Sequence, residues 1–436
     1  MVIIYKLFSS NLLKNSALYV IADGLNRAIP FLLLPIIVRY LTPEDYGIVT
    51  NYAVLIQIMG VFVFGAAQGS IPVNYFKMSK QEFQGYLVSI FSLALLVSFV
   101  FLVLVVISHV YIEDLLNLNY KFLLLSVVEV MLSAFTCVNM LMWRCEEKPV
   151  KFGVYQIIQT LLTVILTIVM VVFLKMAWEG KILANFAITF LMGLLSLVIL
   201  HWRKYYRLKL DFTYSKMVLA FALPLIPHAL ALWGKTGVDK VLITNLVGLS
   251  ENGLYSTAIT WGAIITIVNT SFSNAYSPYL FKQLAKFDKM ENANEVMRAK
   301  KKIVKLSYLF VAGLAVIVFL SYFVFYALII FIYPESYHGA TKFLFWILLG
   351  EFFRGWYMIY ICYVHYTFNT KVLGAITFSL SLLQVALSYL LILSMGTIGA
   401  AISTCIVSIL TTIGVGLFSN RVYYMLWLLN YNRYAK

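Results

Sequence analysis

The sequence predicts an all-α integral membrane protein in which twelve transmembrane helices form two six-helix bundles around a central cavity. Three observations lead to this fold class: the composition, the spacing of apolar runs and an internal repeat. Hydrophobic residues make up 62% of the 436 residues and charged residues only 12%, whereas soluble domains carry about 25% charged residues. Because no polar stretch is long enough to fold by itself, a soluble fold and a large catalytic domain outside the membrane are both excluded.

Each predicted helix corresponds to an apolar run, since about 20 apolar residues are needed to cross the hydrocarbon core. In chain order, the predicted spans are residues 12–38, 48–71, 83–108, 122–142, 152–175, 183–201, 218–247, 254–277, 303–333, 343–366, 372–394 and 398–418. The first span contains Pro30 and Pro35, and the seventh contains Pro224 and Pro227. A proline inside a helix removes a backbone hydrogen bond and bends the helix, so we expect both spans to be kinked.

The distribution of Lys and Arg orients the spans. Alternate connections contain 24 of these residues, and the opposite connections contain five. Because basic residues accumulate in cytoplasmic loops, both termini are predicted to be cytoplasmic. The longest polar connection, residues 282–305, is then cytoplasmic, and we expect an interfacial helix against anionic headgroups there. Residues 419–436 are expected to form a short tail at the cytoplasmic interface.

Two pairs of similar segments indicate an internal repeat. LTPEDYGIVTNY (Leu41–Tyr52) aligns with VGLSENGLYSTA (Val247–Ala258) at an offset of 206 residues. GKILAN from Gly180 aligns with GTIGAA from Gly396 at an offset of 216 residues. Parallel repeats of this kind are common in transporters, which bind their substrate between the halves near the membrane midplane. The repeat predicts two six-helix lobes, residues 1–205 and residues 206–418.

Eight ionisable side chains lie near the middle of predicted spans, where a single Arg, Lys or Asp costs about 2.5–3.5 kcal/mol. They are Asp23, Arg27, Glu129, Lys235, Asp239, Lys240, Glu351 and Arg354. Three oppositely charged pairs are spaced three or four residues apart on one helix, so internal ion pairs that lock the helices are one interpretation. The other is a hydrated cavity, in which protonation of an acid releases its partner cation to bind an anionic substrate.

The sequence contains no motif for a cofactor, a metal ion or an enzyme active site. HExxH, GxSxG and CxxC are absent. Gly234-Lys235-Thr236 resembles the end of a phosphate-binding loop, but Ala229 occupies the position of the first glycine. The net charge of +15 is explained by topology, so we expect no nucleic-acid partner. We likewise expect no cofactor, no metal ion and no enzymatic activity.

Several features together resemble the Wzx-type polysaccharide and O-antigen flippases of the multidrug/oligosaccharidyl-lipid/polysaccharide exporter superfamily. These are the twelve spans, the parallel repeat, the TPEDYG turn repeated as LSENG, the PLIPHAL stretch followed by Asp239-Lys240, and GTIGAA at the start of the last span. The resemblance covers essentially the whole chain. It implies translocation of an undecaprenyl-diphosphate-linked oligosaccharide from the cytoplasmic to the periplasmic leaflet of a bacterial inner membrane, by alternating access.

The resemblance also implies roles for ionisable residues within the spans. Cationic residues in the central cavity of such flippases meet the diphosphate, and this role would fall on Arg27, Lys235 and Arg354. The acids expected to couple transport to an ion gradient are Asp23, Asp239, Glu351 and Glu129. The expected partners are the lipid-linked glycan, membrane lipids, and the polymerase and other proteins that assemble surface polysaccharides such as lipopolysaccharide.

Two other functions stay open at this point. A cation-coupled multidrug antiporter of the same superfamily would favour an unpaired acid in the first half, but Asp23 has Arg27 one helical turn away. A membrane glycan polymerase or glycosyltransferase would need a large outward-facing loop with catalytic residues, and every outward connection here is short. The flippase is therefore the preferred interpretation.

Overall fold

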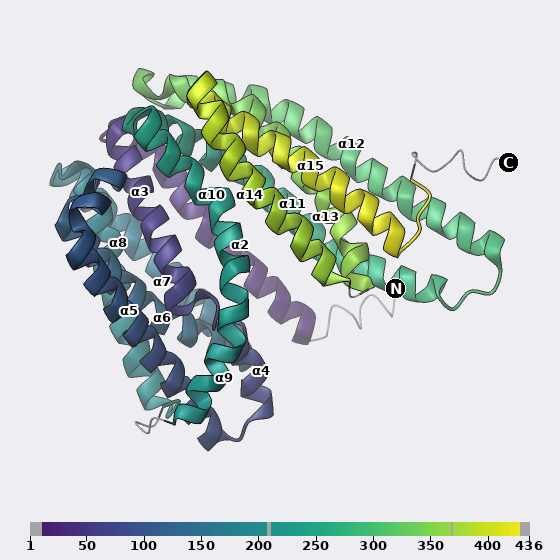
Figure 1. The fold of residues 1–436 in the computed structure, drawn as a ribbon, viewed down its shortest axis with the longest axis horizontal. Helices are drawn as coiled ribbons and strands as arrows, with labels where there is room; N and C mark the ends of the chain where they lie inside the picture. Colours follow the sequence, from purple (N-terminus) through teal and green to yellow (C-terminus); the bar gives the residue numbers. More distant parts are fainter. Residues whose placement is uncertain (1–10, 207–210, 368, 428–436) are drawn as a thin grey trace. The chain divides into compact units, whose positions relative to one another are not determined.

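A computed structural model describes residues 11–206, 211–367 and 369–427, without the side chains at positions 11–17, 19–23, 27, 232, 235, 236 and 370. These residues are almost entirely helical and include no β-strand, which confirms the predicted all-α class (Figure 1). The elements in chain order are α2 (Asn11–Ile37), α3 (Pro43–Gly60), η1 (Val61–Gly65), α4 (Ser70–Lys77), α5 (Lys80–Leu116), α6 (Tyr120–Cys145), α7 (Pro149–Ile168), η2 (Val169–Phe173), α8 (Ala177–Trp202), α9 (Phe212–Ala222), η3 (Leu223–Leu225), α10 (Ile226–Leu246), α11 (Leu249–Phe287), α12 (Ala293–Ile332), η4 (Glu335–Ala340), α13 (Thr341–Tyr366), α14 (Thr370–Met395) and α15 (Ile398–Val422).

Each predicted span falls on helical segments of the structure, and the second, fifth and seventh spans each cover more than one of them. Within the described ranges, ten stretches are long and apolar enough to cross a membrane. The other two predicted spans are α2, whose apolar part is Gly24–Ile37, and α11, whose sequence is rich in Ser, Thr and Asn. The predicted disruption of the seventh span is confirmed, because the short 3-10 helix η3 at Pro224 separates α9 from α10. Helix α2 contains Pro30 and Pro35 and remains one helix.

Local sequence explains where the helices of the first half begin. Thr42 caps α3: its hydroxyl accepts a hydrogen bond from the Asp45 backbone N–H at 3.1 Å, and the Asp45 carboxylate accepts one from the Thr42 N–H at 2.9 Å. Ser79 and Glu82 form the same reciprocal pair at the start of α5. Such capping boxes satisfy backbone donors that the first helical turn leaves unpaired.

The positions of the helix starts support the internal repeat and correct one of its alignments. Helices α3 and α11 begin 206 residues apart, at the predicted offset. At the start of the last helix in each half, Ala177 and Gly396 both have positive φ, and three residues later Gly180 and Gly399 approach the backbone of the preceding helix. The glycine equivalent to Gly180 is therefore Gly399, and the predicted pairing of Gly180 with Gly396 is shifted by three residues.

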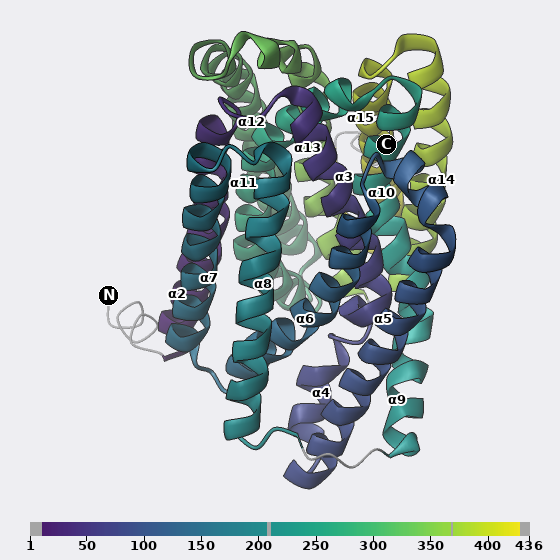
Figure 2. The same ribbon diagram turned by 90° about the vertical axis from the view of Figure 1, so that its left-hand side faces the viewer.

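The chain divides into two compact units, residues 1–233 and 234–436, with the division inside α10. The predicted lobe boundary after residue 205 lies earlier in the sequence and stays a prediction. In the first unit, α6 packs against α5, α8 and α3, while α2 packs along α7 (Figure 2). Helix α9 belongs to this unit because it packs against α5, where Tyr214 lies over Gly85.

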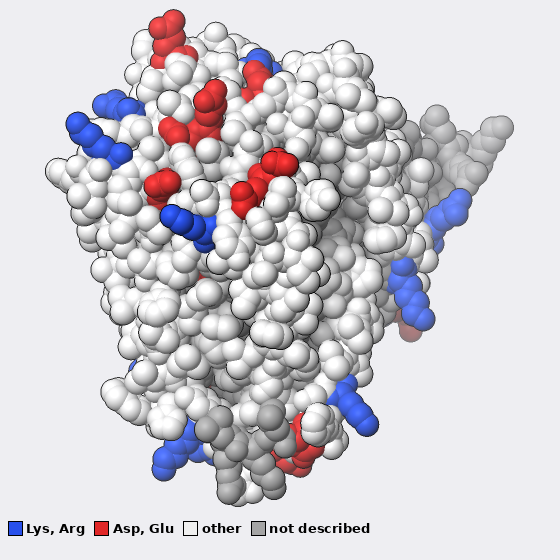
Figure 3. All heavy atoms as spheres, turned by 60° about the vertical axis from the view of Figure 1, so that its left-hand side comes forward, with Lys and Arg blue, Asp and Glu red and all other residues white. Residues whose placement is uncertain are grey.

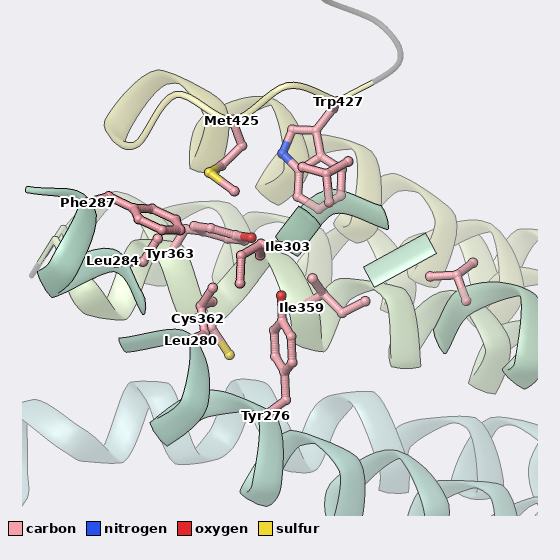
Figure 4. Packing of buried hydrophobic residues seen from close by; sticks show 12 residues of the cluster. Tyr276, Leu280, Leu284, Phe287, Ile303, Ile359, Cys362, Tyr363, Met425 and Trp427 are labelled. Atoms are coloured by element: carbon pink, nitrogen blue, oxygen red, sulfur yellow. The ribbon is translucent and has the colours of Figure 1, made fainter. Parts of the chain in front are cut away.

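The second unit is built around α13, which packs against α15, α11 and α12. Helix α15 continues to Val422, four residues beyond the predicted span, and the first residues of the tail fold back onto the unit. Met425 and Trp427 are buried in a cluster with Ile303 and Tyr363, as Figure 4 shows. This part of the predicted interfacial tail therefore packs on protein, and residues 428–436 lie outside the described residues.

The surface of the molecule shows the charge pattern of a membrane protein. On the face drawn in Figure 3, acidic and basic side chains gather toward the upper and lower ends, and the middle of the face carries mostly uncharged atoms. Large apolar side chains are exposed on many helices, including Phe99 and Ile107 of α5 at 61% and 76%. In water such a surface would aggregate, so these side chains face acyl chains in a multi-pass membrane protein.

Candidate functional site

The most enclosed carboxylate described in the second unit is that of Asp239 on α10. Its side chain is 3% exposed. One oxygen, Oδ2, accepts hydrogen bonds from the hydroxyl of Thr404 at 3.1 Å, the hydroxyl of Tyr255 at 3.4 Å and the amide of Gln384 at 3.4 Å. These donors come from α15, α11 and α14. Asp239 therefore joins four helices of this unit through one carboxylate.

The bonding of this carboxylate is unbalanced. All three donors to Oδ2 are neutral, as is the hydroxyl of Ser388, which also interacts with this carboxylate, while Oδ1 is buried and accepts no hydrogen bond of ordinary length from the described residues. Lys240, its neighbour in sequence, interacts with Asp239 electrostatically. A buried carboxylate that lacks full compensation is costly in its charged form. The site is therefore suited to taking up a proton or a small cation at the Asp239 carboxylate.

The first unit contains a second buried carboxylate, Glu129 on α6, which is 8% exposed. The hydroxyl of Tyr52 on α3 donates a hydrogen bond of 2.7 Å to its Oε2. Lys181 on α8 interacts with it electrostatically, and the Lys181 ammonium also contacts Asn185 Oδ1 at 3.3 Å and Thr167 Oγ1 at 3.4 Å. Unlike Asp239, Glu129 has a lysine from a neighbouring helix in its surroundings. Lys181 precedes the predicted sixth span, residues 183–201, but it lies in the second turn of α8.

The predicted pair on α13 is confirmed. Arg354 Nη1 lies 3.2 Å from Glu351 Oε1, and the side chains are 46% and 16% exposed. The amide of Asn269 on α11 donates to the backbone carbonyl of Glu351 at 2.9 Å, which places these two residues at the same level. Glu351 Oε2 is buried and has no hydrogen-bond partner among the described residues. Arg354 is thus an exposed cation on the second unit, in the middle of a spanning helix.

Helix α11, which packs against α13, is unusual among the long helices because its exposed surface is polar or small. Its exposed residues near the level of Asn269 include Ser271, Asn274 and Ala275. Tyr279 is the one large apolar residue of α11 that is exposed by more than a third in the described chain. Such a surface suits contact with water better than contact with acyl chains. This surface of α11 therefore has the polarity expected of a helix face in contact with water.

Three of the predicted site residues cannot be compared with the structure. The side chains of Arg27, Asp23 and Lys235 lie outside the described residues, so their predicted pairings also lie outside them. The predicted candidates that the structure describes fall in two groups: Glu129 in the first unit, and Asp239, Glu351 and Arg354 in the second. Sequence reasoning did not identify the groups around the acids: Tyr255, Gln384 and Thr404 near Asp239, and Tyr52 and Lys181 near Glu129.

Comparison with known proteins decides the family. The model of the polysaccharide biosynthesis protein family matches residues 12–284, which is more than half of the chain. The chain belongs to this family. The capsular polysaccharide biosynthesis protein CapF of Staphylococcus aureus is 25% identical over 437 aligned residues, covering 94% of this chain and all of that protein. A membrane protein of Haemophilus influenzae is 23% identical over 63% of this chain. The match spans 66% of the length of that relative and of a second one from the same organism.

Solved structures share the fold. The lipid II flippase MurJ in an inward closed conformation matches with a TM-score of 0.71 and 18% identity, over 93% of this chain and 87% of that chain. An inward-facing multidrug resistance MATE family transporter of the MOP superfamily matches with a TM-score of 0.66 and 13% identity, over 93% and 94%. The family confirms the predicted resemblance to proteins of polysaccharide biosynthesis, and the likeness to these two structures shows that the fold is shared.

Proposed function

We propose that this protein translocates an undecaprenyl-diphosphate-linked oligosaccharide from the cytoplasmic to the outer leaflet of a bacterial plasma membrane, by alternating access and driven by a cation gradient. The observation that carries the proposal is the contrast between two charges of the second unit. Arg354 is exposed at membrane depth, whereas Asp239 is sealed among four helices. An accessible cation suits an anionic cargo, and an enclosed carboxylate suits a small coupling cation.

Arg354 is the proposed contact for the diphosphate. A diphosphate that crosses the membrane must exchange its water for other partners, because leaving it unsolvated is prohibitive. The guanidinium matches phosphate oxygens with two parallel hydrogen bonds, which makes Arg preferable to Lys for this role. In the absence of cargo its charge is balanced by Glu351 at 3.2 Å. Arg27 and Lys235 are proposed as further contacts, from the positions that they hold in the sequence.

Asp239 is the proposed coupling residue. A proton or Na⁺ on its carboxylate would remove the cost of a buried negative charge, and carboxylate, hydroxyl and amide oxygens are suitable ligands for hard cations. Since Asp239 bonds to α11, α14 and α15, occupancy would alter how α10 packs on those helices. Helix α10 follows the helix break at η3, so α10 could bend at this break when its packing changes. Cargo and cation would then bias the same conformational equilibrium.

The remaining acids are proposed for secondary roles in coupling. Lys181 supplies a positive charge near Glu129 from a neighbouring helix, and neither Glu129 oxygen is buried without a hydrogen bond of ordinary length, whereas Asp239 Oδ1 is; we therefore expect Glu129 to depend less on an external cation than Asp239 does. Glu351 is proposed to release Arg354 when the cargo binds, and Asp23 is proposed to act on Arg27 in the same way. The cytoplasmic location of both termini follows from the distribution of Lys and Arg and belongs to the same proposal.

The partners are proposed from the relatives. One relative that the chain matches over almost its whole length is named for capsular polysaccharide biosynthesis, which supports a role in a surface-glycan pathway with a polymerase and other assembly proteins. The cargo would then be the lipid-linked repeat unit of a surface polysaccharide.

Deletion of the gene followed by complementation tests this function. We expect the deletion strain to accumulate lipid-linked glycan on the cytoplasmic side and to lose surface glycan, and we expect the wild-type gene to restore both. Accumulation of the cargo with unchanged drug resistance would support the flippase. If the deletion instead altered drug resistance and left lipid-linked glycan unchanged, the antiporter would be the better assignment. Unpolymerised single repeat units on the outer surface would indicate the polymerase.

A further inference from the structure

Helix α12 is longer than a membrane-spanning helix needs to be. It runs without interruption for 40 residues, which is about 60 Å at 1.5 Å per residue, whereas the hydrocarbon core is about 30 Å thick. The basic run that we expected on a separate interfacial helix forms the first turns of α12 itself. The basic residues Arg298, Lys301, Lys302 and Lys305 are all exposed. The N-terminal end of α12 therefore extends out of the membrane and carries these charges with it.

These charges lie on one side of α12. Positions 298, 302 and 305 are separated by four and three residues, which is the spacing of a single helical face, and Lys301 flanks them. The same face continues into the membrane with the exposed side chains Leu309 (68%), Val316 (58%), Leu320 (56%) and Phe323 (55%). The opposite face is buried in the second unit through Ile303, Val304, Ser307, Val311 and Leu314. The basic residues thus lie in line with side chains that meet acyl chains.

The tail holds this end of the helix in place. Lys300, the basic residue on the buried side, donates a hydrogen bond of 2.8 Å to the Tyr424 carbonyl, and its ammonium lies 5.0 Å from the centre of the Tyr423 ring. The Tyr423 hydroxyl donates to Asp288 at 2.9 Å in the connection between α11 and α12. Trp427 packs against Tyr308 of α12 with ring centres 5.7 Å apart. The basic face is therefore presented by a supported helix.

We propose that Arg298, Lys302 and Lys305 form a binding face for the phosphate headgroups of anionic phospholipids in the cytoplasmic leaflet. Lipids whose chains contact Leu309 and Val316 have their headgroups beside Lys305 and the turns before it. From position 298 to position 305 the helix rises about 10 Å, and the headgroup layer of one leaflet is about 5–8 Å deep. The three charges therefore span the depth at which headgroup phosphates lie.

The arrangement of these basic residues on one side of α12 is not explained by the orientation of the protein in the membrane. At the same place in the first half, α4 ends at the exposed Lys77 and α5 begins at the exposed Lys80, and the first turns of α5 carry no comparable row of basic residues. Topology depends on the number of basic residues in a loop and not on the side of a helix that carries them. The basic residues need to lie on the same side of α12 as its acyl-facing side chains only if they contact lipids around the protein. The proposal concerns bulk phospholipid and does not depend on the identity of the transported cargo.

The test compares R298Q/K302Q/K305Q with K282Q/K286Q/K289Q. The second variant removes three exposed positive charges from the same hairpin, two at the end of α11 and one in the connection that follows it. Lys282 and Lys286 continue a face of α11 that carries Ser271, Ala275 and Pro278. Each protein is reconstituted in phosphatidylcholine membranes, and its preference for spin-labelled phosphatidylglycerol over spin-labelled phosphatidylcholine is measured by electron paramagnetic resonance. With a contribution of about fivefold per basic residue, we expect the first variant to lose at least tenfold in preference and the second to resemble wild type.

Two further measurements keep the outcome interpretable. The variant R298K/K302R/K305R keeps the charges and should keep the preference, which separates loss of charge from misfolding. Undecaprenyl diphosphate is added as a competitor. Retention of the phosphatidylglycerol preference in R298Q/K302Q/K305Q would overturn the proposal. An equal loss of preference in K282Q/K286Q/K289Q would also overturn it. Displacement of the spin-labelled phosphatidylglycerol by undecaprenyl diphosphate, at concentrations at which unlabelled phosphatidylglycerol does not compete, would overturn it as well, since the face would then bind the cargo.

Discussion

At the scale of single residues, accessibility separates the charges that the membrane makes costly. Arg354 is 46% exposed beside a carboxylate on its own helix, and Asp239 is 3% exposed among neutral hydrogen-bond donors. An exposed cation can exchange its partner for a phosphate, whereas an enclosed carboxylate exchanges only a proton or a small ion. The two residues therefore suit different ligands although both lie within spanning helices.

Arg354→Met tests the role of the exposed cation. A hydrogen bond to a charged group contributes about 1.5–3 kcal/mol, so we expect the rate of lipid-linked glycan translocation to fall roughly 10- to 100-fold, since 1.4 kcal/mol corresponds to a factor of ten. The measurement is the rate at which the cargo becomes accessible at the outer surface of membrane vesicles. Lys342→Met is the control, because Lys342 pairs with Glu251 at 2.7 Å and both side chains are substantially exposed. Equal loss in the two variants would contradict the assignment.

The chemical type of a residue also determines whether its role in the site can be predicted from the sequence. Asp239, Glu129, Glu351 and Arg354 could be identified because an ionisable side chain in an apolar run is rare. Gln384, Thr404 and Tyr255 could not, since many neutral polar residues occur in these spans and only packing selects the ones that reach Asp239. Lys181 falls just before the predicted sixth span because hydropathy does not separate the first turns of a helix from the loop before it.

At the scale of elements, a group of hydrogen-bonded polar side chains connects the C-terminal ends of α6 and α8 in the first unit. Glu146 follows α6, and its carboxylate bonds to Lys148 at 2.7 Å and to Arg203 and Tyr205, which follow α8. Arg203 also lies over the ring of Trp143. Burial alone would raise the pKa of Glu146, but these hydrogen bonds and the charges of Arg203 and Lys148 outweigh it and lower the pKa below its usual value. These hydrogen bonds thus hold the end of α6 against the end of α8.

The lowered pKa of Glu146 predicts a pH dependence of stability. The stabilisation is present above the ordinary glutamate pKa of about 4.3 and is lost as the pH falls through the lower pKa of the folded protein. We expect Glu146→Gln to reduce the thermal midpoint in detergent by a constant amount between pH 5 and pH 8, and we expect the difference from wild type to shrink below about pH 4. A difference that grows on acidification would contradict this account.

Gly399 tests the packing at the turn between α14 and α15. A Cβ atom at this position would lie 2.2 Å from the Leu391 carbonyl oxygen, so the backbone would have to move. We expect Gly399→Ala to reduce the free energy of unfolding by about 1–3 kcal/mol or more. At Gly374 in α14 an added Cβ meets nothing within 4 Å, and Gly374→Ala should leave stability unchanged or raise it by about 0.5–1 kcal/mol. Thermal unfolding in detergent measures both, and an equal response would disprove the close contact.

Hydropathy predicted the elements well and their ends less well. Apolar runs locate spans because each span must bury about 20 residues in hydrocarbon, but they do not indicate where a helix stops once it leaves the membrane. For that reason the extension of α12 and the packing of Met425 and Trp427 on it could not be predicted. The polar exposed surface of α11 could not be predicted either, because the sequence alone does not tell which side of a span faces water.

At the scale of the whole molecule, the internal repeat organises the chain, and the two halves differ in their chemistry. Helices α3 and α11 start 206 residues apart, yet the two buried carboxylates have different surroundings. The lysine that interacts with Glu129 comes from a neighbouring helix, whereas Asp239 has its sequence neighbour Lys240 and neutral donors from three other helices. A repeated scaffold with one half specialised for the coupling ion would give transport a single driving site. The fold class and the repeat followed from sequence, whereas this asymmetry required the side-chain packing.

The most direct test of the central claim is gradient-driven translocation in proteoliposomes that contain wild-type protein or Asp239→Asn, together with an undecaprenyl-diphosphate-linked oligosaccharide. Asn keeps the shape of the side chain and a carbonyl oxygen for the donors, and it cannot carry the negative charge. We expect an imposed proton or Na⁺ gradient to accelerate translocation by the wild-type protein at least tenfold, roughly 1.4 kcal/mol, and to have no effect on Asp239→Asn. Equal acceleration of both proteins would contradict the account.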